Sequence, residues 1–402
     1  MSNKSVKVFL SVIVAVVILA GAVAVGNTVI NGRQPDAVPA GATVAETQAP
    51  ESTTAAAQPV TLSFLSVGDN LIHDGIYEQA NRRAGGDGYD FTFCYERIAD
   101  TIAAADIATI NQETPIAESY DPSGYPLFNS PVELGQEVRE IGFDVVNMAN
   151  NHMLDKTAKG LTESMDFWDS QEGVVRTGAY KNADELDAVE YIERDGMKIG
   201  LVGITQYTNG LSLPESSELE IIYTTETETI ERKIKAAAES CDAVLVNVHW
   251  GSEYTTTPSQ DQRNLAEQMA SWGADVIIGH HPHVLQPVEW IENDDGSRTL
   301  VAYSLGNFIS QQNTAARVIG GMLHYDMTID PQSGSVTVGN VKFETIVTHY
   351  VNGSHDVQVY PLSEYTDALA KRQASRIKQS DFSIAYIEEF VNGVIDAEFL
   401  AS

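Results

Sequence analysis

The sequence predicts a layered α/β fold, and three features of residues 61–402 lead to that prediction. Short β-branched runs alternate with helical stretches as far as residue 283. Beyond that point several strand-like runs follow one another, and two helical stretches close the chain. Alternating strands and helices are typical of sheets covered by helices. Consecutive strands favour antiparallel additions to such a sheet.

The individual elements follow from these runs in chain order. In the first part, apolar β-branched runs such as KIGLVGI and AVLVNV predict strands at 61–67, 107–110, 144–147, 198–204, 243–248 and 275–278. Helical periodicity between them predicts helices at 95–105, 134–141, 158–171, 226–239 and 260–272. In the last part we expect strands at 284–291, 298–303, 321–329, 335–343 and 357–360, then helices at 363–379 and 383–399.

The charge balance narrows the classes of partner. Among 402 residues, 56 are Asp or Glu and only 24 are Lys or Arg, which gives a formal net charge of -32. Such a protein is a poor partner for nucleic acid, because phosphate binding needs Lys and Arg. An acidic surface can instead help to collect cations. The two cysteines, Cys94 and Cys241, are compatible with one bridge or with two buried thiols.

The amino-terminal region predicts export and a membrane anchor. The run VFLSVIVAVVILAGAVAV at 8–25 carries no charge and is nearly long enough to cross a bilayer. Lys4 and Lys7 precede it, so we expect a cytoplasmic tail at 1–7, a single-pass signal anchor at 8–26 and an extracytoplasmic remainder. Ala22-Val23-Ala24 also fits signal peptidase, and cleavage there would make the protein secreted. Residues 27–60 lack aromatic side chains and predict a disordered linker, followed by one domain at 61–402.

Polar side chains gather where the predicted strands end. Ligands bind beyond the carboxyl ends of strands in α/β sheets, and carboxylate, amide and imidazole groups bind Zn²⁺, Mn²⁺ or Fe²⁺. The residues at these strand ends are Asp69, Glu113, Asn150, Asn151, His152, His249, His280, His281 and His283. The sequence therefore predicts a site for one or two divalent metal ions.

Taken in order, these clusters resemble the motifs of the CapA family of capsule-synthesis proteins. The motifs are Gly68-Asp69, Asn111-Gln112-Glu113, Asn150-Asn151-His152, His249-Trp250-Gly251-Ser252-Glu253, GHHPHV at 279–284 and Ser304-Leu305-Gly306-Asn307-Phe308, all within 61–310. The resemblance implies a calcineurin-like metallophosphoesterase fold, a four-layer α/β/β/α sandwich. It also implies a role in poly-γ-glutamate synthesis or export at the cell surface.

The resemblance assigns a role to each matching residue. The implied metal ligands are Asp69, Glu113, Asn151, His249, His281 and His283, and His152 matches the general acid or orienting histidine. Residues expected to support the ligands or contact substrate are His73, Asn150, Trp250, Glu253, His280 and Asn307. Two positions depart from the phosphoesterase pattern. Leu71 stands where that pattern has a histidine, and Glu113 stands where it has a metal-bridging aspartate.

Several of these residues also have a purely structural explanation. Asp69 could cap a helix, Asn150 and Asn151 could be turn residues, and Trp250 could be a packing residue.

Three functions are compatible with these features. The first is metal-dependent hydrolysis or transfer in poly-γ-glutamate capsule synthesis or export. The second is a non-catalytic accessory role beside the subunits of a membrane capsule synthase. The third is a secreted phosphoesterase that acts on an envelope phosphodiester.

Overall fold

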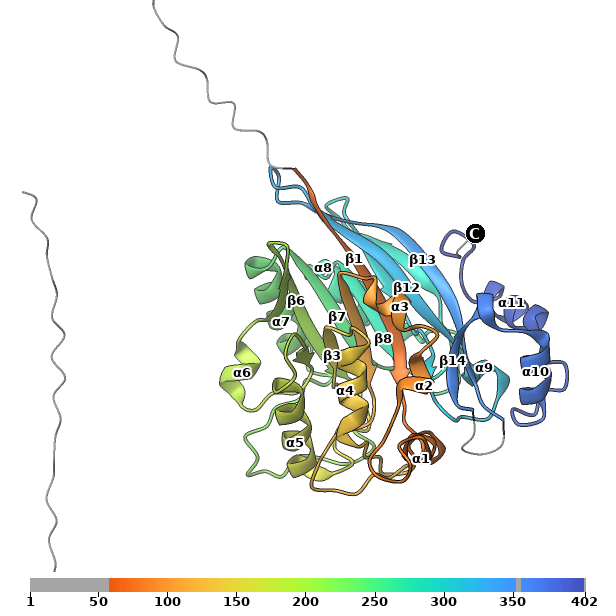
Figure 1. The fold of residues 1–402 in the computed structure, drawn as a ribbon. Helices are drawn as coiled ribbons and strands as arrows, with labels where there is room; N and C mark the ends of the chain where they lie inside the picture. Colours follow the sequence, from red (N-terminus) through yellow and green to blue (C-terminus); the bar gives the residue numbers. More distant parts are fainter. Residues whose placement is uncertain (1–57, 352–355, 401–402) are drawn as a thin grey trace, which may run out of the picture. The chain divides into compact units, whose positions relative to one another are not determined.

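Two β-sheets form the framework of the protein (Figure 1). The structure, a computed structural model, describes residues 58–351 and 356–400. The predicted tail, anchor and nearly all of the linker lie outside these residues. Within them, no helix is both long and apolar enough to cross a membrane.

The eight-stranded sheet has parallel strands on one side of β1 and antiparallel strands on the other. The strands of its path are, in spatial order, β14 (Gln358–Pro361), β13 (Val336–His349), β12 (Ile319–Ile329), β1 (Val60–Asn70), β2 (Ile107–Gln112), β3 (Val145–Asn147) and β4 (Val175–Thr177). The short strand β11 (Asn307–Ile309) runs parallel to β1 and pairs Asn307 with Asp69. The antiparallel strands β12 to β14 confirm the additions predicted from the consecutive strand pattern.

The six-stranded sheet has a parallel centre and antiparallel edges. Its strands are, in order, β5 (Glu190–Arg194), β6 (Met197–Thr205), β7 (Ala243–His249), β8 (Val276–His280), β10 (Arg298–Ala302) and β9 (Val288–Glu292). Strand β10 pairs parallel to β8, so the prediction that 298–303 forms an antiparallel addition is wrong for this contact. Only its hairpin partner β9 runs antiparallel to it.

Alternation along β7 shows which face of the second sheet carries polar side chains. Val244, Val246 and Val248 join a buried cluster with residues of α7 (Thr227–Ser240) and α8 (Gln260–Ser271). Leu245 points to the opposite face and belongs to the large core shared with the first sheet. Because successive strand side chains alternate, His249 faces the first sheet as well. The space between the two sheets is therefore where the strand-end residues meet.

Further helices surround this framework. They are α1 (Asp74–Arg83), α2 (Thr92–Tyr95), α3 (Ala99–Ala103), α4 (Val132–Glu140), α5 (Thr157–Asp169), α6 (Ala183–Asp187), α9 (Ala315–Val318), α10 (Asp367–Ala374) and α11 (Ile384–Asn392), with a 3₁₀ turn at Leu362–Glu364. Apolar side chains of α4 and α5, such as Leu134 and Met165, pack into the core of the first sheet. In Figure 1 α7 lies beside β6, consistent with its packing on β6 and β7.

Some predicted elements differ from the observed ones. The prediction of a single helix at 95–105 is wrong. Two short helices, α2 and α3, occupy this region instead. Tyr95 ends α2 and donates its hydroxyl to Asn70 Oδ1 at 2.8 Å, a tertiary contact that local periodicity does not encode. The short elements α1, α6, α9, β4, β5 and β11 were not predicted. Cys94 and Cys241 are free thiols, so the bridge is absent.

Candidate metal centre

The parallel strands bring the predicted ligands to one edge of the two facing sheets. Asp69 lies near the end of β1, Glu113 directly follows β2, and His249 is the last residue of β7. His281 and His283 lie in the loop that follows β8. All five side chains are buried. Residues separated by up to 214 positions in the chain thus become neighbours.

Two glycines allow the backbones near the ligands to approach closely. A Cβ atom on Gly68, the residue before Asp69, would lie 1.9 Å from the backbone oxygen of Gly306. A Cβ atom on Gly279 would lie 2.0 Å from the backbone oxygen of Tyr303. Both approaches need a residue without a side chain. The segment 303–307 therefore lies directly against the ends of β1 and β8.

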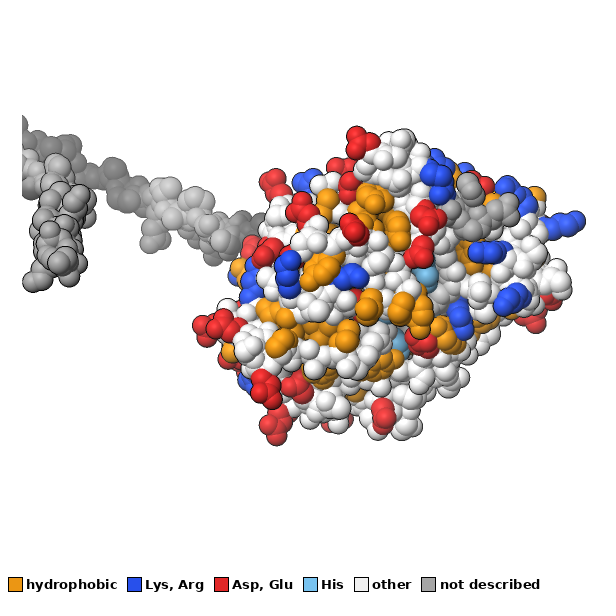
Figure 2. Space-filling model, turned by 90° about the horizontal axis from the view of Figure 1, so that it is seen from below, with side chains coloured by type: hydrophobic (Ala, Val, Ile, Leu, Met, Phe, Trp, Pro, Cys, Tyr) orange, Lys and Arg blue, Asp and Glu red, His pale blue; other side chains and the backbone are white. Residues whose placement is uncertain are grey.

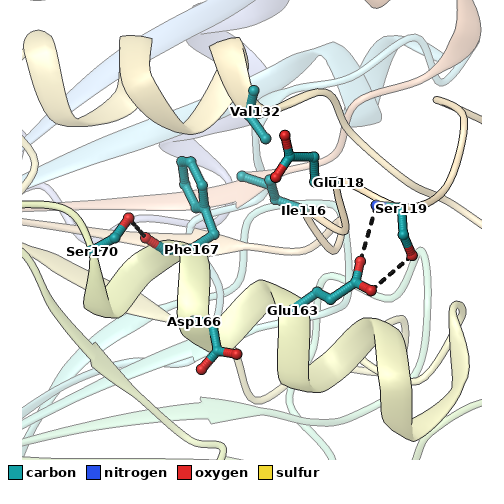
Figure 3. A pocket seen from close by; sticks show the side chains of 8 residues that line it. All are labelled: Ile116, Glu118, Ser119, Val132, Glu163, Asp166, Phe167 and Ser170. Atoms are coloured by element: carbon teal, nitrogen blue, oxygen red, sulfur yellow. Dashed lines mark hydrogen bonds between the residues drawn. The ribbon is translucent and has the colours of Figure 1, made fainter.

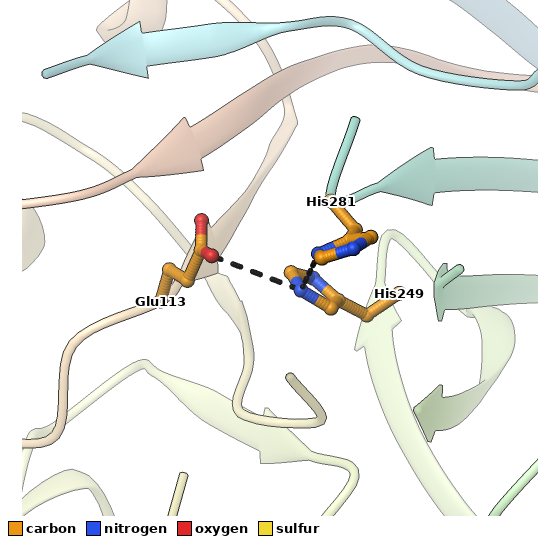
Figure 4. Close-up of side chains that lie close together, drawn as sticks. All are labelled: Glu113, His249 and His281. Atoms are coloured by element: carbon orange, nitrogen blue, oxygen red, sulfur yellow. Dashed lines mark hydrogen bonds and ion pairs between the residues drawn. The ribbon is translucent and has the colours of Figure 1, made fainter. Parts of the chain in front are cut away.

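The ligands form two sets that share Glu113. Glu113, His249 and His281 form one set, and Asp69, Glu113 and His283 form the other. Within each set the ligand atoms all lie within 4.8 Å of one another. Figure 4 shows the first set, with the carboxylate of Glu113 pointing toward the two imidazoles. A shared carboxylate between two ligand sets suits a pair of ions.

The first set is extended by an amide and a phenol. His249 Nε2 lies 2.9 Å from Asn151 Oδ1, 3.1 Å from His281 Nδ1 and 3.7 Å from Glu113 Oε1. The Tyr207 hydroxyl forms a hydrogen bond with His281 Nε2. Since Nε2 is occupied in this way, Nδ1 is the ring nitrogen of His281 that faces the other ligands.

The second set is centred on His283. Its Nδ1 lies 3.0 Å from Asp69 Oδ2, and its Nε2 lies 3.7 Å from Glu113 Oε1. Asn307 Oδ1 is 3.1 Å from the same Nδ1. Asn111 donates its side-chain NH₂ to Asp69 Oδ1 at 2.8 Å and thereby orients this carboxylate. Asn307 thus brings an amide oxygen beside His283 in the second set.

Glu113 fits a cation-binding role. Both of its carboxylate oxygens are buried and have no hydrogen-bond partner among the described residues. A buried carboxylate without a partner is costly, so burial raises the pKa of Glu113 well above its usual range. A divalent cation held by these ligands would offset the cost of burying this carboxylate. The donors present, carboxylate, amide and imidazole, are those preferred by Mn, Zn and Fe.

The histidines are electrostatically suited to the same role. Burial lowers the pKa of His281 to about 3 and that of His280 to about 4, and it holds the pKa of His249 well below its usual value. Neutral imidazoles are the form that binds metal. His283 differs, because although burial lowers its pKa, the carboxylates of Glu113 and Asp69 outweigh burial and raise it to about 9. Burial by itself would raise the pKa of Asp69. The hydrogen bond and charge of His283, the charge of His280 and the hydrogen bond from Asn111 together outweigh burial, and the net shift is downward.

The loop after β8 adopts an unusual backbone conformation at both of its ligands. His281 has a φ of 98° and His283 a φ of 57°. Residues other than glycine rarely adopt positive φ, and such strain persists only where surrounding contacts enforce it. In this conformation the ring of His281 contacts that of His249, and the ring of His283 contacts the carboxylate of Asp69.

His152 lies beside the ligands with its ring held from two sides. Its Nδ1 is 2.7 Å from Asp155 Oδ2, and its ring packs edge-on against Phe128 at a centroid distance of 4.7 Å. The backbone NH of His152 donates to Asn150 Oδ1 at 3.0 Å. Asp155 thus fixes one ring nitrogen and leaves Nε2 for other contacts, the arrangement typical of an oriented general acid or base.

The other predicted residues lie at different depths around the centre. His280 Nδ1 is 3.7 Å from Asp69 Oδ1 and has no hydrogen-bond partner among the described residues. His73 packs edge-on against Phe128, and burial lowers its pKa to about 4. Asn150 bonds backbone groups and shapes the turn that carries His152.

Trp250 and Glu253 are not brought to the ligands. The Trp250 ring packs in the core beside α7 and α8, and its Nε1 donates to Tyr303 O at 3.0 Å. Glu253 is exposed, although its charge still acts on Glu113 and His283.

Sequence reasoning missed three residues that touch the centre. Asp155 could have been noticed, because it lies three positions after His152 in the same turn. Tyr207 and Asn209 gave no signal, since each lies in the irregular segment after β6. Asn209 Oδ1 accepts a bond from Asn151 Nδ2 at 3.3 Å.

Two surface grooves differ in their relation to the centre. A groove of about 640 Å³ beside α5 is lined by Glu118, Glu163, Asp166, Phe167 and others and contains none of the ligands (Figure 3). A second groove of about 530 Å³ includes Tyr207, which contacts His281. Most of its other lining side chains are hydroxyls and amides, and Asp261 is the only charged one. Figure 2 shows histidine side chains at the surface between apolar and acidic ones.

The fold and the site define a two-sheet α/β protein with a candidate metal centre at the strand ends. The family model of the bacterial capsule synthesis protein PGA_cap matches residues 63–312 of the chain. This is more than half of its length, and the chain therefore belongs to that family. The matched residues include all six predicted ligands and His152.

Two curated relatives match the chain over about two thirds of its length. The PGA biosynthesis protein CapA of Bacillus subtilis (strain 168) is 27% identical over 270 residues, which are 66% of this chain and 68% of that protein. The capsule biosynthesis protein CapA of Bacillus anthracis is 27% identical over 276 residues, which are 66% of this chain and 64% of that protein. The chain thus spans about two thirds of the length of these relatives.

Solved structures with partial overlap include a phosphatase from Mycoplasma pneumoniae. This phosphatase is 15% identical to the chain with a TM-score of 0.42, and the match covers 72% of the chain and 95% of the phosphatase. A 5'-nucleotidase from Candida albicans is 10% identical with a TM-score of 0.38 and covers 82% and 57% of the respective chains.

Proposed function

We propose that the chain acts in the synthesis or export of a poly-γ-glutamate capsule through a metal-dependent hydrolase or transferase site. Membership in the capsule synthesis family and the names of the CapA relatives support the process. One observation carries the chemical part of the proposal. Both buried oxygens of Glu113 lack a hydrogen-bond partner among the described residues, and this carboxylate is shared by the two ligand sets.

The chain's own residues then have distinct tasks. Asp69, Glu113, Asn151, His249, His281 and His283 would hold the ions, with Asn307 beside the second set. A divalent ion held there supplies Lewis-acid activation of a water molecule and of a substrate oxygen. His152, oriented by Asp155, would give a proton to the leaving group through Nε2. Tyr207 fixes the ring of His281 and forms the border with the neighbouring groove.

The groove beside Tyr207 suits a polymer chain. An anionic polymer is repelled by a protein with a net charge of -32, although salt shortens the range of this repulsion to about 8 Å. A groove lined by hydroxyl and amide groups avoids adding local repulsion and offers hydrogen bonds to a polyamide backbone. The metal ions would add positive charge where the polymer meets the ligands.

The site of action belongs to the same proposal. A domain anchored by residues 8–26 would act outside the cytoplasm, beside the membrane subunits of a capsule synthase. Protease digestion of intact cells should remove the domain, whereas a protected domain would contradict this placement.

The function is tested with the full-length chain loaded with Mn²⁺ and incubated with poly-γ-glutamate. We expect wild type to shorten or transfer the polymer, measured by its change in chain length. His152→Ala should keep its metal and lose activity roughly 100-fold or more. Glu118→Gln, a change in the groove away from the ligands, should behave as wild type.

A phosphodiester of the cell envelope is the second candidate substrate. Two ligand sets around one carboxylate favour it, because paired ions are typical of phosphoryl-transfer enzymes. Turnover of a simple phosphodiester, with poly-γ-glutamate unchanged, would select this candidate. If metal-loaded wild type changes neither substrate, the enzymatic proposal fails and an accessory role in the capsule machinery replaces it.

A further inference from the structure

The guanidinium of an arginine lies over an aromatic ring at the rim of the metal centre. The guanidinium carbon of Arg317, in α9, is 3.2 Å from the centroid of the Tyr254 ring. The Tyr254 ring centroid is in turn 6.2 Å from that of His283. Tyr254 is 42% exposed, so this pair lies between solvent and the buried ligands.

Both members of the pair are tied to the metal centre by hydrogen bonds. The backbone NH of Tyr254 donates to Pro282 O at 2.7 Å, and Pro282 lies between the ligands His281 and His283. Asn307 Nδ2 donates to the backbone oxygen of Arg317 at 2.9 Å, while its Oδ1 approaches His283. The position of the arginine is thus coupled to the same residues that position the ligands.

Tyr254 also has a left-handed backbone, with a φ of 65°. This conformation is unfavourable for an aromatic residue and typically persists at functional positions. It accompanies the placement of the ring between the arginine and His283.

The charge of Arg317 is not used for a salt bridge within the described residues. Six arginines of the described residues form an ion pair with a carboxylate, namely Arg97, Arg176, Arg194, Arg232, Arg263 and Arg372. Arg317 forms no such pair in that part of the chain, although acidic residues outnumber basic ones by 56 to 24. A cation left without a carboxylate in so acidic a protein is available to a ligand.

We propose that Arg317, stacked on Tyr254, binds an oxyanion of the substrate, a carboxylate or a phosphate, beside the metal centre. The aromatic face holds the guanidinium plane and leaves its edge for two parallel hydrogen bonds to an oxyanion. This inference rests on the proposed function, because it requires an anionic substrate at the ligands. It explains how a strongly acidic protein holds an anion there.

The test measures binding to the Mn²⁺-loaded full-length chain by calorimetry. The probes are a γ-linked glutamate tetramer, which offers carboxylates, and inorganic phosphate. Arg317→Gln should weaken binding of whichever probe wild type binds by about tenfold or more, because a charge-assisted hydrogen-bonded pair is lost. Metal content, measured in parallel, should stay at the wild-type level.

Two further variants sharpen the result. Arg298→Gln is the control. The guanidinium of Arg298 also lies over an aromatic ring, 4.3 Å from the centroid of Trp290, but Arg298 is the first residue of β10, so this variant should bind like wild type. Arg317→Lys keeps the charge but lacks the planar two-donor edge, so it should also weaken binding. The lysine variant decides the matter if Arg317→Gln does not fold.

The outcomes separate this inference from the proposed function. If wild type binds a probe and both Arg317 variants bind it equally well, the inference is overturned and the proposed function stands. If the Arg317 variants lose metal together with the probe, the residue has a structural role and the inference is also overturned. If wild type binds neither probe, both ideas fail. The probe that binds identifies the oxyanion as carboxylate or phosphate.

Discussion

Glu113 is the residue through which the two ligand sets are linked. Its buried carboxylate belongs to both sets, and a single oxygen, Oε1, faces a histidine of each. His249 and His283 each lie 3.7 Å from its Oε1. The glutamate therefore belongs to both ligand sets, and Asn307 Oδ1 adds an oxygen beside His283.

Metal stoichiometry tests this arrangement at single residues. We expect two ions per chain in wild type and one in His281→Ala, because Asp69, Glu113 and His283 remain as a set. Glu113→Gln removes a ligand charge from both sets and should lower affinity for both ions more than about tenfold. The measurement is metal content after dialysis, followed by titration.

Glu118→Gln is the matched control, since Glu118 is exposed and lies outside both ligand sets. An unchanged metal content in Glu113→Gln would contradict the shared-carboxylate arrangement. A single ion in wild type would show that only one of the two sets is occupied.

At the scale of elements, the site depends on how closely β1 approaches the segment that carries Asn307. Asp69 donates its backbone NH to Gly306 O at 2.9 Å, and Gly68 has no room for a side chain against the same oxygen. Strand β11 then pairs with β1 so that Asp69 and Asn307 lie side by side. The positions of Asp69 and Asn307 in the second ligand set thus depend on how closely these two backbone segments pack.

Gly68→Ala tests this dependence. The added methyl group would meet a backbone oxygen at 1.9 Å and must push the strands apart, which should lower the free energy of unfolding by about 2 kcal/mol or more. Urea denaturation measures the change, and metal content should fall with it. Gly339→Ala in β13 is the control, because its Cβ would meet nothing within 4 Å and should leave stability unchanged or slightly raised. Equal stability of the two variants would show that the approach is not tight.

At the scale of the whole molecule, the metal centre lies where the two sheets meet. One large core contains residues of both sheets, such as Val67 of the first and Leu245 of the second. The ligands come from both sheets as well. Bound ions would therefore connect the sheets and stabilise the fold as a unit.

Removal of metal provides the corresponding test. A ligand present at about 100 times its Kd stabilises a protein by about 2.7 kcal/mol, so a chelator should lower the Tm of wild type by roughly 4 °C. Differential scanning calorimetry measures the shift. Glu113→Gln, which loses affinity, should show little response to the chelator. A wild-type Tm that does not respond would mean that the ions do not link the sheets.

The sequence by itself determined the alternation of elements and the residue types of the site. Runs such as 243–248 and 260–272 agree closely with β7 and α8, because each has strong apolar periodicity over its length. The strand ends predicted Asp69, Glu113, His249 and the histidines after β8 as neighbours, since parallel strands end at one edge. The local sequence pattern was sufficient to predict an element wherever the periodicity of its apolar residues matched the face that the structure buries.

Only the tertiary structure decided which of these residues meet and which do not. It placed Trp250 in the core beside α7 and α8 and Glu253 at the surface, although both belong to the same motif as His249. It brought in Tyr207 and Arg317, whose local sequence carries no signal. Contacts between segments more than 70 residues apart depend on packing of whole sheets, which no local run of residues encodes.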